Sequence, residues 1–168
     1  DRGSVYSLNT FDLTGGFKLE VTQSIDVIND GNRLNIGLTD RPAGNVDMPL
    51  TFNKDANAIG LQMTAARGDQ GLKWANDVGS GGISTLSNDQ AITATPTVNV
   101  WQTWVLDVDA SGNWSYSIDG ATATAGTQAI AFDFTKEYRF WAHEQILGAT
   151  QDFKVQSVKL TVIPEPSS

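Results

Sequence analysis

Cysteine is absent from the 168-residue sequence, and histidine occurs once, at position 143. Without cysteine the chain has no disulfide framework, no thiolate metal site and no cysteine nucleophile. A single imidazole also excludes a zinc site built from several histidines. Long apolar runs are missing too, because no stretch approaches the ~20 residues of a membrane-spanning helix. The sequence therefore predicts no membrane span in this chain.

Positive charge is scarce. The sequence has 11 Lys and Arg against 19 Asp and Glu, and its formal net charge is −8. No Lys/Arg run supplies the electrostatic footprint that phosphate binding needs, so we expect no nucleic-acid partner. Hydrophobic residues make up 40% and charged residues 18% of the chain, which argues against both a disordered tail and a long-helix protein. The length fits one domain with a substantial core.

Alternation of apolar and polar residues dominates the chain. Between Phe17 and Val27 the alternation is typical of a half-buried strand. The same pattern predicts strands at 34–38, 59–63, 138–145 and 153–162, and a hairpin over 104–118 around the turn at 109–113. The Gly/Ser/Asn-rich segment 74–95 is interpreted as loops with short strands, and the segment 71–74 as a Gly-rich loop that exposes Trp74. Many short strands separated by turn residues predict an all-β, two-sheet antiparallel sandwich.

The order of these elements resembles the concanavalin A-like or laminin-G-like jelly roll. The pieces that carry the resemblance are FDLTGGF at 11–17, LNIGLTD at 34–40, WVLDVD at 104–109, YSIDG at 116–120 and VQSVKLT at 155–161. The resemblance covers almost the whole chain and implies a lectin-like jelly-roll domain over residues 1–162. It implies the fold rather than the ligand, because folds host many functions.

The C-terminal residues IPEPSS at 163–168 resemble the opening of a PEP-CTERM sorting signal. That signal is found at the C-terminus of exported proteins in some Gram-negative, exopolysaccharide-producing bacteria. In that family an apolar helix and a basic cluster follow the Pro-Glu-Pro, and both are missing here. The resemblance implies a secreted or cell-envelope protein of a Gram-negative bacterium, with an extended tail at 163–168 and an anchor removed after Ser168.

Catalytic carboxylates of the expected kind are missing. Glycoside cleavage needs two carboxyl groups roughly 5–10 Å apart. The sandwich hydrolases that resemble this fold carry them as Glu-x-Asp-x-x-Glu or Glu-x-Asp-x-Glu, and neither spacing occurs here. The Arg, Gln-x-His and Tyr motifs of sandwich alginate lyases are also absent. His143 and Glu144 are adjacent on a predicted strand and point to opposite faces. We therefore expect no catalytic residues.

One face of the strand at 138–145 is the candidate ligand surface. If Phe140 and Ala142 face the core, Trp141 and its polar neighbours face outward, where an indole can stack on a pyranose while polar side chains bond its hydroxyls. The resembled family commonly binds ligands on its concave sheet. The candidate ligand-binding residues are Trp141, His143, Arg139, Gln145, Asn35, Gln62, Arg67 and Trp74. The alternative for Trp141 is burial under a loop or between the sheets.

The other tryptophans, Trp101, Trp104 and Trp114, are predicted to be structural. The Asp-rich run at 107–113 is interpreted as a hairpin turn, because it lacks the downstream Glu of a calcium-binding EF-hand loop. The resemblance nevertheless implies a structural calcium ion. Asp1, Asp12 and Asp152 are the candidate carboxylates, and no other cofactor is expected.

Two functions remain open at this stage. The first is a non-catalytic domain that binds a polysaccharide or another glycan through the face bearing Trp141. The second is a structural or adhesive envelope or matrix protein without a small ligand. An unrecognised lyase or hydrolase is a third, less favoured reading, because the paired carboxylates are missing.

Overall fold

A computed structural model describes residues 2–25, 33–40, 58–63, 71–75, 97, 99–121, 124–125, 133–145 and 153–165. These residues form strands joined by turns, and every strand pairing among them is antiparallel. The strands are β1 (Arg2–Tyr6), β2 (Phe11–Asp12), β3 (Gly16–Ile25), β4 (Arg33–Thr39), β5 (Ala58–Met63), β6 (Gly71–Ala75), β7 (Gln102–Asp109), β8 (Trp114–Ile118), β9 (Thr124–Ala125), β10 (Glu137–Gln145) and β11 (Phe153–Val162).

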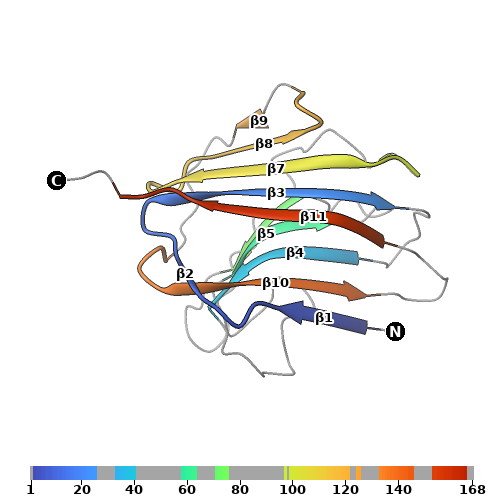
Figure 1. Ribbon diagram of the computed structural model, residues 1–168. Coiled ribbons are helices and arrows are strands. Elements are labelled where there is room, and N and C mark those ends of the chain that lie inside the picture. The colour runs from blue at the N-terminus through green and yellow to red at the C-terminus, as the bar shows by residue number, and fades with distance from the viewer. Residues whose placement is uncertain are drawn as a thin grey trace.

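The strands form two stacked sheets (Figure 1). Sheet I has the order β1-β10-β4-β5-β6, and β2 also pairs with β10. Sheet II has the order β11-β3-β7-β8-β9. The N-terminus and the C-terminus lie at opposite ends of the sandwich (Figure 1). The predicted all-β, two-sheet antiparallel sandwich is confirmed.

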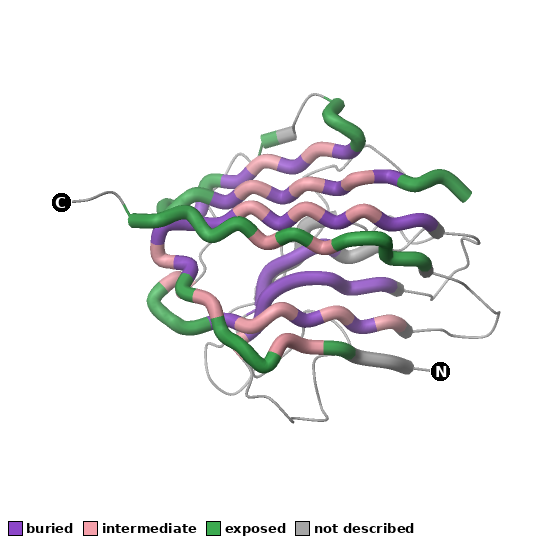
Figure 2. Tube along the Cα trace, viewed as in Figure 1, coloured by how far each residue is buried: buried purple, intermediate pink, exposed green. Residues whose placement is uncertain are grey.

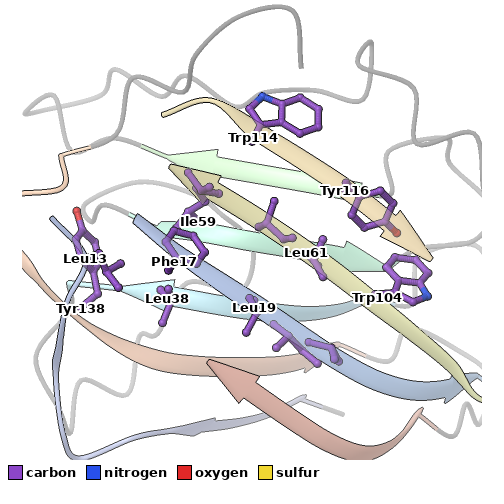
Figure 3. Close-up of a cluster of buried hydrophobic side chains, with 14 of the residues drawn as sticks. Leu13, Phe17, Leu19, Leu38, Ile59, Leu61, Trp104, Trp114, Tyr116 and Tyr138 are labelled. Atoms are coloured by element: carbon purple, nitrogen blue, oxygen red, sulfur yellow. The ribbon is translucent and has the colours of Figure 1, made fainter. Parts of the chain in front are cut away.

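The hydrophobic core lies between the sheets (Figure 3). Sheet II contributes alternate residues of β3, β7 and β8, and sheet I contributes residues of β4, β5 and β10. Trp104 and Tyr116 pack edge to face, with ring centroids 5.7 Å apart. Trp104 and Trp114 are buried at 0% and 4% exposure. The prediction that these two tryptophans are structural is therefore confirmed, and their burial contributes to the core.

The two sheets differ in how their outer faces, turned away from the core, are covered. In β7 and β8 buried residues alternate with half-buried ones, as expected of a sheet with one face toward solvent (Figure 2). In sheet I the run 34–39 of β4 and the run 58–61 of β5 are buried throughout (Figure 2). The centre of sheet I is therefore protected from solvent on both faces.

Two glycines bring β4 and β5 together at this centre. Gly37 pairs with Gly60. A Cβ on Gly37 would lie 2.2 Å from the carbonyl oxygen of Ile59, and a Cβ on Gly60 would lie 2.2 Å from that of Ile36. Both distances are far inside van der Waals contact. The strands approach this closely because neither position carries a side chain.

The β7–β8 hairpin is closed by Asp109. Its Oδ1 accepts the N–H groups of Ser111 (2.8 Å) and Asn113 (2.9 Å), and its Oδ2 accepts Nδ2 of Asn113 (2.8 Å). Gly112 takes the left-handed conformation, with φ 79°, which glycine adopts without steric cost. The interpretation of this Asp-rich run as a turn is confirmed.

Two expectations about local structure are wrong. The segment predicted as a Gly-rich loop around Trp74 is a strand, β6, in which Trp74 pairs with Ile59 of β5. Trp101, predicted to be structural, is 49% exposed just before β7. The alternation of apolar and polar residues could not predict either the strand at Trp74 or the exposure of Trp101, because strand pairing and packing decide both. Within the described residues, no helix is long and apolar enough to cross a membrane.

Candidate glycan-binding face on sheet I

Strand β10 presents alternate residues to the two faces of sheet I. Tyr138 belongs to the core cluster, and Phe140 and Ala142 pack against it. The intervening residues Trp141 and His143 therefore point to the outer face. This is the strand phase that the sequence predicted. Trp141 is buried but does not belong to the core cluster between the sheets.

Exposure on this outer face is lower than expected. Trp141 is 0% exposed and His143 is 2% exposed. The open platform expected for both residues is wrong, and burial, the alternative stated for Trp141, is what the structure has. Alternation tells which face a side chain takes, but it does not report whether that face is covered. The indole of Trp141 is therefore buried on the outer face of sheet I. It lies neither on an open platform nor between the two sheets.

Polar side chains share this buried outer face. Asn35 pairs with His143, and Thr39 pairs with Arg139, which places the two β4 side chains in the same rows. Asn35 and Thr39 are each 0% exposed. Polar groups are rarely buried without a structural or binding role, because taking them out of water costs free energy unless they are bonded. Asn35, Thr39, Trp141 and His143 together are called the sheet I floor below.

Arg139 has a defined structural role at one end of this face. Its Nη1 donates to the backbone oxygens of Ser7 (3.0 Å) and Leu8 (3.3 Å). Ser7 is also tied to β10, since its N–H donates to the oxygen of Phe140 (2.9 Å) and its Oγ accepts the N–H of Phe140 (2.9 Å). Arg139 is half-buried. It therefore fixes the segment after β1 against β10.

The remaining predicted contact residues are only partly placed. Gln62 pairs with Asn35 in the β4–β5 ladder, and Gln145 pairs with Arg33 at the end of β10. Trp74 lies within β6. Arg67 lies outside the described residues. The structure thus brings Asn35, His143, Trp141 and Arg139 onto one face of sheet I, and the β-ladder places Gln62 beside Asn35.

Tyr6 is a residue of this face that the sequence interpretation missed. Tyr6 is the last residue of β1 and pairs with Trp141 of the neighbouring strand β10, so the two aromatic side chains share a face of the sheet. Unlike Trp141, Tyr6 is only half-buried. The segment around it has too few apolar residues for alternation to mark a strand. The strand β1 is identified by its pairing with β10, which is distant in the sequence.

Two of the described glutamates are engaged in structural contacts. Glu20 bridges Lys159 (3.0 Å) and Lys18 (3.8 Å) on the outer face of sheet II. The hydrogen bond from Lys159 holds the pKa of Glu20 below its ordinary value, whereas a catalytic acid needs a raised pKa. Glu137 accepts a hydrogen bond from Oγ1 of Thr10 (2.9 Å). Glu20 thus lacks the environment of a glycosidase acid.

Of the calcium candidates, only Asp12 lies within the described residues. Its Oδ1 accepts both the N–H (3.0 Å) and the Oγ1–H (2.7 Å) of Thr14, and these bonds lower its pKa. Asp1 and Asp152 lie outside the described part of the chain. The described residues contain no group of three or more histidine and carboxylate side chains that could hold a metal ion. They do not fit a calcium site by themselves.

Solved structures with the same arrangement of strands include several carbohydrate recognition domains. The carbohydrate recognition domain of Emp47p superposes with a TM-score of 0.65 at 13% identity, covering 95% of this chain and 77% of that one. The exoplasmic/lumenal domain of VIP36 in its Ca2+- and mannose-bound form gives a TM-score of 0.66 at 14% identity, covering 99% and 75%. The fold is that of the concanavalin A-like lectins.

The same lectin fold also occurs in a protein named for an enzyme. Rv0315 of Mycobacterium tuberculosis, described as an immunostimulatory antigen and pseudo β-1,3-glucanase, gives a TM-score of 0.62 at 12% identity, covering 94% of this chain and 68% of that one. No family model matches the sequence, and no curated protein matches it. The likeness at these identities establishes the fold, and function must be argued from the site.

Proposed function

We propose that this domain is a non-catalytic carbohydrate-binding module whose ligand lies over the outer face of sheet I. The sheet I floor carries the proposal: an indole, an imidazole, an amide and a hydroxyl gather on the face turned away from the core. These four side chains are at most 2% exposed, so they form the layer beneath the proposed ligand surface, and an apolar group with a few fixed polar groups is the usual lining of a ligand site. The carbohydrate recognition domains with this fold support the same reading.

Within this proposal the floor residues position the ligand surface, and Tyr6 contacts the ligand. The floor is buried, whereas Tyr6 beside Trp141 is only half-buried. A phenol ring can stack on the apolar face of a pyranose, and its hydroxyl can bond a sugar hydroxyl. Arg139 keeps the neighbouring segment in place through Ser7 and Leu8. A rigidly held aromatic loses little entropy on binding.

The proposed ligand is a neutral glycan. The chain has a formal net charge of −8, which repels polyanions such as alginate and slows their association. A bound mannose in the VIP36 structure supports a neutral hexose as the type of ligand. The proposal includes an exported or cell-envelope location, supported by the likeness of residues 163–168 to a sorting signal. It does not include a calcium ion among the described residues.

The test is affinity electrophoresis in gels that contain galactomannan, xyloglucan, laminarin or alginate. We expect retention by a neutral polysaccharide and none by alginate. Tyr6→Ala should lower the affinity for that polysaccharide about tenfold, because one stacking contact is lost. Leu8→Ala is the matched control, because Leu8 is 80% exposed two residues away and should bind as the wild type does. Equal retention of Tyr6→Ala and the wild type would refute the proposed contact.

Trp141 itself is a poor choice for this test. Its indole is 0% exposed, and truncation of a buried tryptophan to alanine costs about 3–5 kcal/mol of stability. A loss of binding in Trp141→Ala would therefore report unfolding as well as a changed surface. Tyr6 and Leu8 avoid this problem because both retain solvent contact.

A structural or adhesive role is the second candidate, and strand β11 favours it. This ten-residue strand pairs only with β3 among the described strands and lies at the edge of sheet II. Its residues 154–157 are exposed, so its outer edge is open to a partner strand. The absence of binding across a glycan array, together with capture of a strand-forming peptide, would favour this candidate over the first.

A further inference from the structure

Trp101 is exposed on the opposite side of the sandwich. It is 49% exposed, whereas Trp104, Trp114 and Trp141 are at most 4% exposed. Trp101 directly precedes β7, where Thr103, Val105 and Asp107 are half-buried between core residues. If this alternation continues one residue before the strand, Trp101 lies on the side of the outer face of sheet II. Its neighbour Val100 is 44% exposed, so two adjacent large apolar side chains are open to solvent here, and contiguous apolar surface is the kind that marks contact sites.

The chain on both sides of this indole is held in place. Oε1 of Gln102 accepts the N–H of Thr97 (2.8 Å). Oδ1 of Asp119 accepts the N–H of Thr103 (2.7 Å), and the N–H of Asp119 donates to the oxygen of Thr103 (2.9 Å). These bonds join the segment before β7 to the turn after β8. Trp101 is therefore an exposed ring on a fixed backbone, which lowers the entropy lost when a ligand binds.

Two residues with left-handed backbone lie near Trp101. Within the described residues, Asn99 (φ 58°) and Asp119 (φ 51°) are the two non-glycine residues in the left-handed region. Asn99 lies two positions before Trp101, and Asp119 bonds to Thr103 two positions after it. Asparagine and aspartate adopt this conformation more readily than other non-glycine residues, so these two positions shape the backbone around Trp101.

Hydroxyl and carboxylate groups lie at the same end of sheet II as Trp101, which is two positions before Thr103 in the chain. The Oγ1 atoms of Thr22 and Thr103 are 2.9 Å apart, and both residues lie on the outer face. The carboxylate of Asp119 accepts the N–H of Thr103 (2.7 Å) and Nε2 of Gln102 (3.4 Å), and because Asp119 is exposed its remaining lone pairs can accept from a sugar hydroxyl. A flat indole beside hydroxyls and an acceptor complements a pyranose, which offers an apolar C–H face and a ring of hydroxyls. Asp119 and the net charge of −8 disfavour an acidic sugar.

We propose that Trp101 is the centre of a second carbohydrate-contact surface, which takes a pyranose unit of a neutral polysaccharide. This surface lies on the outer face of sheet II, on the other side of the core from Tyr6. It goes beyond the function proposed above because it needs none of the residues of sheet I. The two surfaces can therefore be tested separately.

The experiment compares Trp101→Ala and Trp101→Phe with the wild type and with Tyr6→Ala in the same gels of galactomannan, xyloglucan and laminarin. We expect Trp101→Ala to lose about tenfold in affinity and Trp101→Phe to retain part of it. Iodide quenching supplies the direct readout. Iodide should quench the fluorescence of Trp101 in the wild type, and this quenched part should be missing in Trp101→Phe. A saturating polysaccharide should protect that same part of the wild-type fluorescence from iodide.

The outcomes separate the two surfaces. Weakened binding in Trp101→Ala alone supports the sheet II surface and removes the contact assigned to Tyr6. Weakened binding in Tyr6→Ala alone, with unchanged iodide quenching, overturns the sheet II surface. Binding of no polysaccharide by the wild type also overturns it. Protection of Trp101 by a protein partner and by no polysaccharide would overturn it too, since the ligand would then be a protein.

Discussion

Asp109 illustrates how one side chain can fix a turn. Its carboxylate accepts three hydrogen bonds from the residues that follow it. Removing those acceptors in Asp109→Ala should lower the free energy of unfolding by about 1 kcal/mol, the net value of side-chain bonds at an exposed turn. Asp107→Ala is the matched control on the same strand and should change the free energy of unfolding by less than about 0.5 kcal/mol. Urea unfolding at pH 7 measures both.

The same bonds predict the pH dependence. The Asn113 side chain, followed by backbone N–H groups, holds the pKa of Asp109 below its ordinary value. A lowered folded-state pKa contributes stability above the unfolded-state pKa, and that contribution is lost as the pH falls below about 4 and through the folded value. The difference between the wild type and Asp109→Ala should therefore shrink as the pH falls from 7 toward 3. A difference that stays constant over this range would show that the charge is not involved.

At the level of single residues, the sequence predicted the face to which a side chain points better than it predicted how exposed that side chain is. Alternation placed Phe140 toward the core and Trp141 away from it, as the packing shows. It could not report that Trp141 is buried at 0% or that Trp101 is 49% exposed. Burial depends on which distant segments cover a face, and a single strand carries no information about them. The proposed contact residue Tyr6 was missed for the same reason.

At the level of strands, the contact between β4 and β5 depends on two positions without side chains. Gly37→Ala would place a Cβ 2.2 Å from a backbone oxygen of β5. That oxygen belongs to a ladder and cannot move without separating the strands, so we expect a loss of about 1–3 kcal/mol, typical of overpacking. Urea unfolding checks this value.

Gly120→Ala is the informative comparison for Gly37→Ala. Gly120 has φ +70° and nothing within 4 Å of its added Cβ, so alanine there costs only the left-handed conformation, about 1–2 kcal/mol. If the loss at Gly37 arises from strand separation, it should also reduce the hydrogen-exchange protection of β4 and β5 amides. Gly120→Ala should leave those amides protected. Loss of protection in both variants would argue against a local cause.

The strands with strong alternation were predictable, and those with weak alternation were not. The sequence marked β3, β4, β5, β7, β8, β10 and β11 through their apolar periodicity. It did not mark β1, β2 or β9, and it assigned β6 to a loop. These four are short strands of two to five residues that depend on β10, β8 or β5 for their hydrogen bonds. Short strands acquire their structure from the sheet rather than from their own sequence.

For the whole molecule, the two proposed surfaces have a consequence that neither has alone. They lie on the outer faces of different sheets, with the core between them. One ligand surface per molecule cannot join two polysaccharide chains, whereas two opposed surfaces can do so. A domain that uses both should therefore cross-link a long polysaccharide, and it should bind a polymer more tightly than a short oligosaccharide through multivalency.

Light scattering of the domain mixed with high-molecular-weight galactomannan, or with the neutral polysaccharide that retains it in gels, tests this consequence. We expect scattering to rise with added protein and to fall again at large excess, when each surface holds its own chain. Tyr6→Ala and Trp101→Ala should each reduce the scattering strongly while part of the gel retention persists, because one surface remains. Undiminished scattering in both variants would mean that the domains associate with one another, and the exposed edge of β11 would then be the surface to block.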